Sequence, residues 1–109
     1  MYSVVFMDSL NRKWILMCKI LKTLSHTERL KLLALLGSED SSINQLALKC
    51  NISQTAVSRH LRVLQSSGLV DRRKQGLQVY YKIDSCISRL VQELEKMTLC
   101  KLNKQFRSE

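Results

Sequence analysis

Hydroxyl and guanidinium side chains recur at helical spacing near the middle of the chain. They occupy positions i, i+3, i+4 and i+7 and would share one edge of a helix: Thr55, Ser58, Arg59 and Arg62. In the major groove of DNA, arginine binds O6 and N7 of guanine, and short hydroxyl side chains donate or accept hydrogen bonds. Many solvated helix faces have a similar composition, so this helix alone does not distinguish a DNA-contacting face from an ordinary solvated one. The segment that follows it favours one of the two.

A basic hairpin is predicted directly after this helix. Residues 69–74 and 77–83 are rich in β-forming side chains, and apolar residues alternate with polar ones along the second segment: Leu77, Val79, Tyr81 and Ile83. The turn is predicted at Gln75 and Gly76, because glycine tolerates the backbone of a tight hairpin. Three basic side chains near the tip could reach phosphates or a minor groove: Arg72, Arg73 and Lys74. A helix followed by a basic wing at 69–83 predicts a winged helix-turn-helix.

The helix with the polar edge has clear start and stop signals. Ser53 can cap its first turn, and Gly68 suits the left-handed backbone that ends a helix. Three apolar residues at helical spacing would face a core on its other side: Val57, Leu61 and Leu64. One face of this helix therefore packs, and the other is free to contact a partner.

A shorter helix is predicted just before it, at 43–50. Ser42 and Gln45 have the spacing of a capping box at its start. Residues 51–52 then form a short turn, which gives 43–67 the organisation of a helix-turn-helix.

Two amphipathic helices are predicted near the ends of one domain that spans 1–109. The first covers 8–23 and the last covers 84–101. We expect the last helix to pack on the first and across a two-fold axis, so that both are dimerisation helices. The basic tail at 102–109 is expected to fray.

Each of these helices has a candidate N-cap. The candidates are Asp8 or Ser9 for the first helix and Asp84 or Ser85 for the last. A further helix is predicted from Ser25, with Glu28 completing a capping box, to Gly37. Its many leucines make it the expected central, buried helix.

The composition of the 109 residues favours a polyanionic partner. Eighteen Lys and Arg against nine Asp and Glu give a net charge of +9 and a pI near 9.7, so nucleic acid is the expected partner. A membrane surface is the competing polyanion, but no apolar run approaches the roughly 20 residues that span a bilayer. The apolar opening is too short, and lacks the basic start, for a secretory signal. We therefore expect a cytoplasmic protein with reduced cysteines.

Five short motifs between residues 22 and 83 share their residue types and spacing with a known family. They are Leu24-Ser25-His26 with Arg29-Leu30, Ser53-Gln54, Val57-Ser58-Arg59-His60-Leu61 with Leu64, Ser67-Gly68-Leu69-Val70, and Arg73-Lys74-Gln75-Gly76 with Val79-Tyr80-Tyr81. They resemble the ArsR/SmtB family of bacterial winged-helix repressors. The resemblance implies a mainly α fold in which four helices, a small β-hairpin and a fifth helix follow in order. It also implies a homodimer that binds a double-stranded DNA operator and is released by an inducer.

The resemblance assigns roles within the DNA-binding region. Matched positions imply four base-reading residues: Gln54, Thr55, Ser58 and Arg59. They imply contacts to phosphates or a minor groove for Arg62, Arg72 and Arg73. Ser53 and Lys74 complete this set, together with His60, for which a packing role is equally open.

The metal sites of the family are only partly preserved. The Cys-x-Cys pair of some members corresponds to Ser42-Ile43-Asn44, so that site is absent. Zinc sensors of this type carry Asp-x-His, ten residues, then His-x-x-Glu or His, whereas this chain reads Asp84-x-Cys86, ten residues, Met97-x-x-Cys100. Sulfur ligands imply a soft inducer such as arsenite, cadmium or copper(I). Cys86 and Met97 lie about 16 Å apart along one helix, so sharing an ion would need antiparallel last helices from two chains.

The candidate ligands are Cys86, Met97 and Cys100, with Asp84 and Cys18 as further candidates. A thiol switch is a second interpretation, because Cys100 matches the last-helix cysteine of the family's sulfide and redox sensors. The partner cysteine of those sensors corresponds to Ala34, so Cys18 would have to replace it. In a third interpretation the four cysteines are small buried apolar residues.

Two other functions remain as alternatives to an inducible repressor. One is a winged helix used as a protein-interaction module, and the other is a DNA-binding regulator that responds to no ligand. An enzyme is not expected, because the three glycines form no phosphate-binding run and no nucleophile lies at a suitable spacing from a base.

Overall fold

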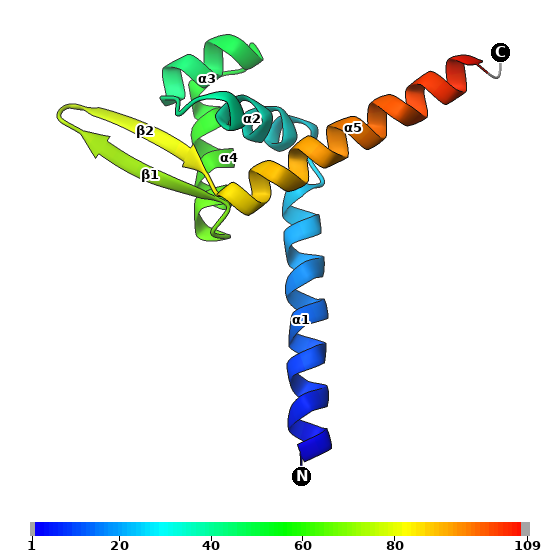
Figure 1. The fold of residues 1–109 in the computed structure, drawn as a ribbon. Helices are drawn as coiled ribbons and strands as arrows, with labels where there is room; N and C mark the ends of the chain where they lie inside the picture. The colour runs from blue at the N-terminus through cyan, green and yellow to red at the C-terminus, as the bar shows by residue number, and fades with distance from the viewer. Residues whose placement is uncertain (1, 108–109) are drawn as a thin grey trace.

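The computed structural model of the chain describes residues 2–107. Its elements follow in the order α1 (Tyr2–Leu24), α2 (Thr27–Ser38), α3 (Ile43–Cys50), α4 (Gln54–Ser66), β1 (Val70–Gln75), β2 (Gln78–Ile83) and α5 (Ser85–Arg107) (Figure 1). The two strands form one antiparallel hairpin. This order confirms the predicted winged helix-turn-helix, mainly helical with a small wing.

The hydrophobic core lies where α2, α3 and α4 meet the base of the hairpin and the first half of α5. The fully or almost fully buried leucines and valine of α2 and α4 are Leu32, Leu33, Leu36, Val57, Leu61 and Leu64. Burial of a side chain of this size contributes about 1.5–3 kcal/mol. The apolar side of α4 is thereby fixed against the core, and its opposite side faces solvent.

Short-range hydrogen bonds fix the ends of α3 and α4. Ser42 Oγ accepts from Gln45 N at 3.2 Å and Gln45 Oε1 accepts from Ser42 N at 2.9 Å, which completes the predicted capping box. Asn51 ends α3 with a left-handed φ of 55°. Ser53 Oγ then accepts from Ala56 N at 3.1 Å, so α4 begins at the predicted cap.

The hairpin turns at Gly76 and Leu77, one residue later than predicted. Gln75 pairs with Gln78, so only Gly76 and Leu77 lie outside the ladder. Gly76 has a φ of +64°, and a two-residue turn favours glycine at its first position for this reason. Leu77 is therefore a fully exposed turn residue and not part of the apolar row of β2.

The base of the hairpin is tied to the loop before α3. Ser41 N donates to Tyr81 O at 3.2 Å, and Tyr81 N donates to Ser41 O at 2.9 Å. Ser41 is fully buried, and Val70 and Ile83 join the core beside it. The wing is thus anchored at its base, while its tip extends away from the helices (Figure 1).

The start of α2 differs from the prediction. The helix begins at Thr27, with His26 as its N-cap residue, and no side chain caps it. Ser25 N instead donates to Lys22 O at 3.2 Å in the tight connection from α1. The carboxylate of Glu28, which a capping box would direct to Ser25, contacts the imidazole of His60. The predicted capping box at Ser25 is therefore wrong. The helix begins two residues later, and the side chain of Glu28 contacts His60 instead of Ser25.

The two terminal helices are longer than predicted. α1 begins at Tyr2, so Asp8 and Ser9 lie inside it and do not cap it, and α5 continues to Arg107 instead of fraying after residue 101. Neither extension contains glycine or proline, so nothing in the sequence stops the helix. Residues 108 and 109 of the predicted tail lie outside the described part.

Helices α1 and α5 diverge from the core in different directions (Figure 1). α5 packs on α2 through Ile87 and Val91, so the predicted packing of the last helix on the first is not found within one chain. Both helices keep apolar side chains in solvent, such as Trp14 at 55% exposure and Met97 at 51%. Even so, no helix among residues 2–107 has the length and apolar character needed to cross a membrane.

Candidate nucleic-acid interface

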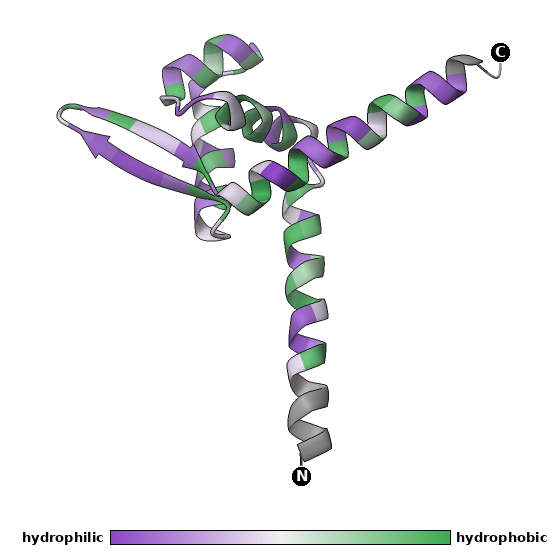
Figure 2. Cartoon of the chain, in the orientation of Figure 1, coloured by the Kyte–Doolittle hydropathy of each residue, from purple (hydrophilic) through white to green (hydrophobic). Residues whose placement is uncertain are grey.

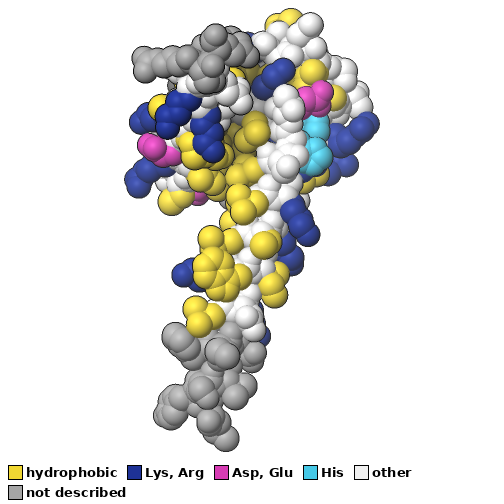
Figure 3. All heavy atoms as spheres, turned by 90° about the vertical axis from the view of Figure 1, so that its right-hand side faces the viewer, with side chains coloured by type: hydrophobic (Ala, Val, Ile, Leu, Met, Phe, Trp, Pro, Cys, Tyr) yellow, Lys and Arg dark blue, Asp and Glu magenta, His cyan; other side chains and the backbone are white. Residues whose placement is uncertain are grey.

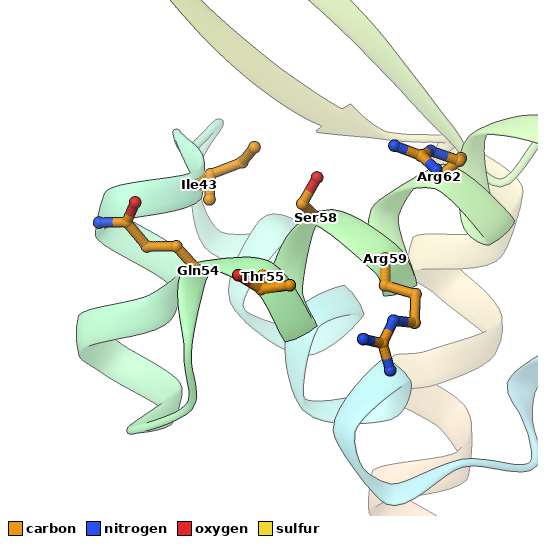
Figure 4. Close-up of a pocket in the computed structure, with 6 residues that line it drawn as sticks. All are labelled: Ile43, Gln54, Thr55, Ser58, Arg59 and Arg62. Atoms are coloured by element: carbon orange, nitrogen blue, oxygen red, sulfur yellow. The ribbon is translucent and has the colours of Figure 1, made fainter.

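The solvent side of α4 forms an open, polar surface. Five of its side chains line one hollow together with Ile43 of α3: Gln54, Thr55, Ser58, Arg59 and Arg62 (Figure 4). They lie on the side opposite the buried residues of the same helix, because the core fixes its rotation. The structure thus brings together all four predicted base-reading residues. Ile43 had no signal in the sequence, because it belongs to the other helix.

Ser53 lies at the start of the same surface. Its hydroxyl oxygen accepts the Ala56 N–H, which leaves its own O–H free to donate. The Ser53 oxygen therefore caps α4, and a contact to DNA would use the Ser53 O–H as donor.

The predicted basic residues of the wing are exposed but do not share one face. In the register of the hairpin, Arg72 lies opposite Tyr81 and Arg73 opposite Tyr80. Successive side chains of a strand point to opposite faces, so Arg72 and Lys74 share the side of Tyr81 and Arg73 points to the other side. β1 is hydrophilic along most of its length (Figure 2). An edge-on approach to a phosphate backbone would use both faces of the wing.

The arginines of these two surfaces have no acidic partner in the described part of the chain. The ion pairs found there are Lys49–Glu39 and Lys96–Glu93, and the carboxylate of Glu28 contacts the ring of His60. Lys49 Nζ lies 2.6 Å from Glu39 Oε1, and its hydrogen bond and charge lower the pKa of Glu39. Arg59, Arg62 and Arg72 are left with guanidinium groups able to bind an external anion.

His60 lies apart from this surface, on the side of α4 that faces α2. Its side chain is 17% exposed, and its Nε2 is 2.7 Å from Glu28 Oε2. Arg29 Nε donates to His60 Nδ1 at 3.3 Å. These placements favour the packing role for His60. The contacts with Glu28 and Arg29 had no signal in the sequence, because no periodicity links residues about thirty positions apart.

The predicted sulfur ligands are dispersed within one chain. Cys86 lies in the first turn of α5, and Cys100 lies near its other end, both exposed. Asp84 Oδ1 accepts from Cys86 N and Ile87 N at 3.0 Å each, so this carboxylate caps α5. Among residues 9–105, whose side chains the structure describes, no group of three His, Cys, Asp or Glu side chains could hold a metal ion. A site that combines both ends of α5 would need a second chain.

The cysteines in the other helices differ in their surroundings. Cys18 is exposed on α1, which diverges from α5 (Figure 1). Cys50, at the end of α3, is half-buried, and burial raises the pKa of its thiol. In the described part of the chain all four cysteines are free.

Comparison with known proteins places this interface in a family. Residues 26–72 match the family model described as "Bacterial regulatory protein, arsR family". The transcriptional activator HlyU of Vibrio cholerae is 32% identical over 84 residues, which are 77% of this chain and 78% of HlyU. The biofilm growth-associated repressor of Agrobacterium fabrum is 36% identical over 76 residues, 69% of this chain and 65% of the repressor.

Solved structures show the same fold. Reduced HlyU from Vibrio cholerae aligns with a TM-score of 0.75 and 25% identity, covering 83% of this chain and 96% of HlyU. The homodimeric winged helix-turn-helix DNA-binding domain of Mb0332 from Mycobacterium bovis aligns with a TM-score of 0.82 and 26% identity, covering 89% and 91%. With its architecture, its polar α4 surface and these relatives, the chain belongs to the arsR family of bacterial regulatory proteins, which regulate transcription by binding DNA.

Proposed function

We propose that a homodimer of this chain represses transcription by binding a double-stranded operator. α4 of each protomer enters the major groove, and the wing contacts phosphates or the adjacent minor groove. The observation that carries this proposal is the α4 surface, whose hydroxyl, amide and guanidinium groups are exposed and point away from the core (Figure 4). The major groove is about 12 Å wide and admits one α-helix.

Roles within the surface follow from chemistry and position. Arg59 and Gln54 can each form two hydrogen bonds to one base edge, so they are the main base-reading residues. Thr55 and Ser58 supply shorter donors and acceptors between them. Arg62 lies further along α4, and the basic residues of β1 follow α4 in the chain. We assign Arg62 and these wing residues to phosphate contacts.

The terminal helices support the assembly of two chains. α1 exposes Trp14, Leu16 and Leu21 at more than half of their surface. Figure 3 shows hydrophobic side chains running along α1 and onto the adjoining body. Contiguous apolar surfaces of this kind mark interaction sites, and the Mb0332 neighbour is a homodimer. We place the protein in the cytoplasm, where operator DNA is accessible and cysteines stay reduced.

Fluorescence anisotropy on a duplex from upstream of the protein's own gene tests the proposal. We expect tight binding to this duplex, with log K falling by about 0.9 per neutralised phosphate for each tenfold rise in salt. Arg62→Ala should weaken binding, whereas Arg89→Ala, which removes an exposed arginine of α5 that does not line the α4 surface, should not. Weak, salt-insensitive binding would contradict the proposal and favour a protein-interaction module.

The same assay, with reduced and metal-free protein, tests the inducer. The sulfur side chains of α5 are our proposed site, since Met97 and Cys100 share one helix face and favour soft ions. Arsenite, cadmium, copper(I) and a persulfide donor are added in turn to the preformed complex. Release by one of them, lost in Cys100→Ser, would identify the signal. Binding that none of them disturbs would mean a regulator that responds to none of these ligands.

A further inference from the structure

The contacts of His60 join three helices. His60 belongs to α4, and both of its ring nitrogens contact the first turn of α2: Nε2 lies 2.7 Å from Glu28 Oε2, and Nδ1 lies 3.3 Å from Arg29 Nε. Arg29 Nη1 also donates to the main-chain oxygen of Thr23 at 3.1 Å. Thr23 lies in the last turn of α1, so one arginine side chain connects the end of α1 with the DNA-facing helix.

These contacts allow only one form of the imidazole. A guanidinium only donates, so Nδ1 of His60 must accept from Arg29. The ring proton therefore resides on Nε2 and is donated to the carboxylate of Glu28. A flipped ring would place carbon atoms at both partners. The neutral ring is thus held in one orientation from two sides, with a side chain that is only 17% exposed.

The contact to Thr23 stabilises the junction from which α1 projects. The last carbonyl groups of a helix lack partners inside the helix, and Arg29 satisfies one of them. Besides this bond, α1 meets the body through its C-terminal residues, where Leu24 is buried and Ile20 is partly buried. The direction of α1 relative to α4 therefore depends on a small number of contacts.

We propose that His60 is a positioning residue that fixes, through Arg29, the angle between α4 and α1. In a dimer joined through α1, this angle sets the separation of the two DNA-facing helices. The inference rests on the proposed function, since it needs two copies of α4 on one operator. α1 is roughly 35 Å long, so a tilt of about 5° displaces its far end by about 3 Å. That shift is close to the rise of about 3.4 Å per base pair.

The consequence is a preference for one spacing of half-sites, which a base contact would not produce. The probe is a duplex that the wild-type protein selects from a random library, with variants whose half-sites are moved apart or together by one and two base pairs. A duplex with a single half-site measures the contacts of α4 alone. Affinities are measured by anisotropy for the full chain at one salt concentration.

Three substitutions carry the test. His60→Leu removes both ring hydrogen bonds, Arg29→Met cuts the link from the α2 side, and His60→Gln keeps an acceptor and a donor in one side chain. His26→Leu is the matched control, because His26 is exposed, its ring centroid lies 6.4 Å from that of His60, and it belongs to the N-cap of α2. Thermal unfolding confirms that each variant is folded.

We expect the wild-type protein, His60→Gln and His26→Leu to prefer the selected spacing by about tenfold or more over its neighbours. His60→Leu should bind the single half-site with nearly wild-type affinity but bind duplexes of several spacings with similar affinities. Arg29→Met should do the same if His60→Leu fails to fold.

A wild-type spacing profile in the folded variants would overturn the inference. So would a uniform loss on every duplex, which indicates a base contact or a general loss of stability. Failure of the wild-type protein to select any duplex would instead overturn the proposed function.

Discussion

Arg59 and Arg72 both present a guanidinium group without an acidic partner in the described chain, but they meet DNA in different ways. Arg59 lies on the α4 surface, so Arg59→Ala should weaken operator binding by about 1–3 kcal/mol and relax base preference. Arg72→Ala should weaken all duplexes similarly and reduce the salt slope by about 1. Titrations of cognate and random duplexes at several salt concentrations separate the two. Equal effects of both changes on both duplexes would contradict this division of roles.

Thiol reactivity distinguishes Cys50 from Cys86. Burial raises the pKa of the Cys50 thiol, so its thiolate forms only at higher pH than that of an ordinary exposed cysteine. We expect Cys50 to be alkylated more slowly than the exposed Cys86 at neutral pH, with its rate rising at higher pH. Mass spectrometry of protein pulsed with iodoacetamide from pH 6 to 10 measures both sites. The difference should vanish in denaturant, and persistence there would show that burial is not its cause.

At the scale of elements, the helix caps allow a matched experiment. Ser42 accepts the Gln45 N–H at the start of α3, whereas Ser25, despite the same sequence spacing to Glu28, caps nothing. Ser42→Ala should lower the free energy of unfolding by about 1 kcal/mol. Ser25→Ala should change it by less than about 0.5 kcal/mol, as for most surface substitutions. Urea unfolding measures both, and equal losses would indicate that the difference in capping has no energetic effect.

The elements also show which features the sequence can predict. α3, α4 and their polar surface were predicted from a cap, a glycine and helical periodicity, all of which act within a few residues. The ends of α1 and α5 were not, because these segments contain no glycine or proline that stops a helix. The predicted start of α2 was wrong, because the side chain of Glu28 contacts His60, 32 positions away, and does not form a capping box with Ser25. The pairing of the wing also differed from the prediction, because the turn lies one residue later: Arg72 lies opposite Tyr81 instead of Val79, while each side chain stays on the same face of the hairpin.

At the scale of the whole molecule, one chain is an incomplete unit. It measures 53 × 50 × 21 Å, with two long helices extending from a small core. Only the ends of these helices nearest the core are covered, and their apolar side chains remain in water. Their burial would add to the core that 109 residues can form, which favours assembly into a larger particle. The separation of the two DNA-facing helices is then a property of the assembly.

Placing a charge on α1 tests this view. Leu21 of α1 and Leu48 of α3 are both exposed leucines, at 57% and 83%. Leu21→Glu should convert the protein to a 12.6 kDa monomer at micromolar concentration, because burying an unpaired carboxylate in the interface costs several kcal/mol. Leu48→Glu should leave the dimer intact. Sedimentation velocity gives both masses, and a dimeric Leu21→Glu variant would exclude this part of α1 from the interface. If Leu21→Glu is monomeric, it should also lose most of its affinity for a full operator while keeping that for a half-site, because α4 itself is unchanged.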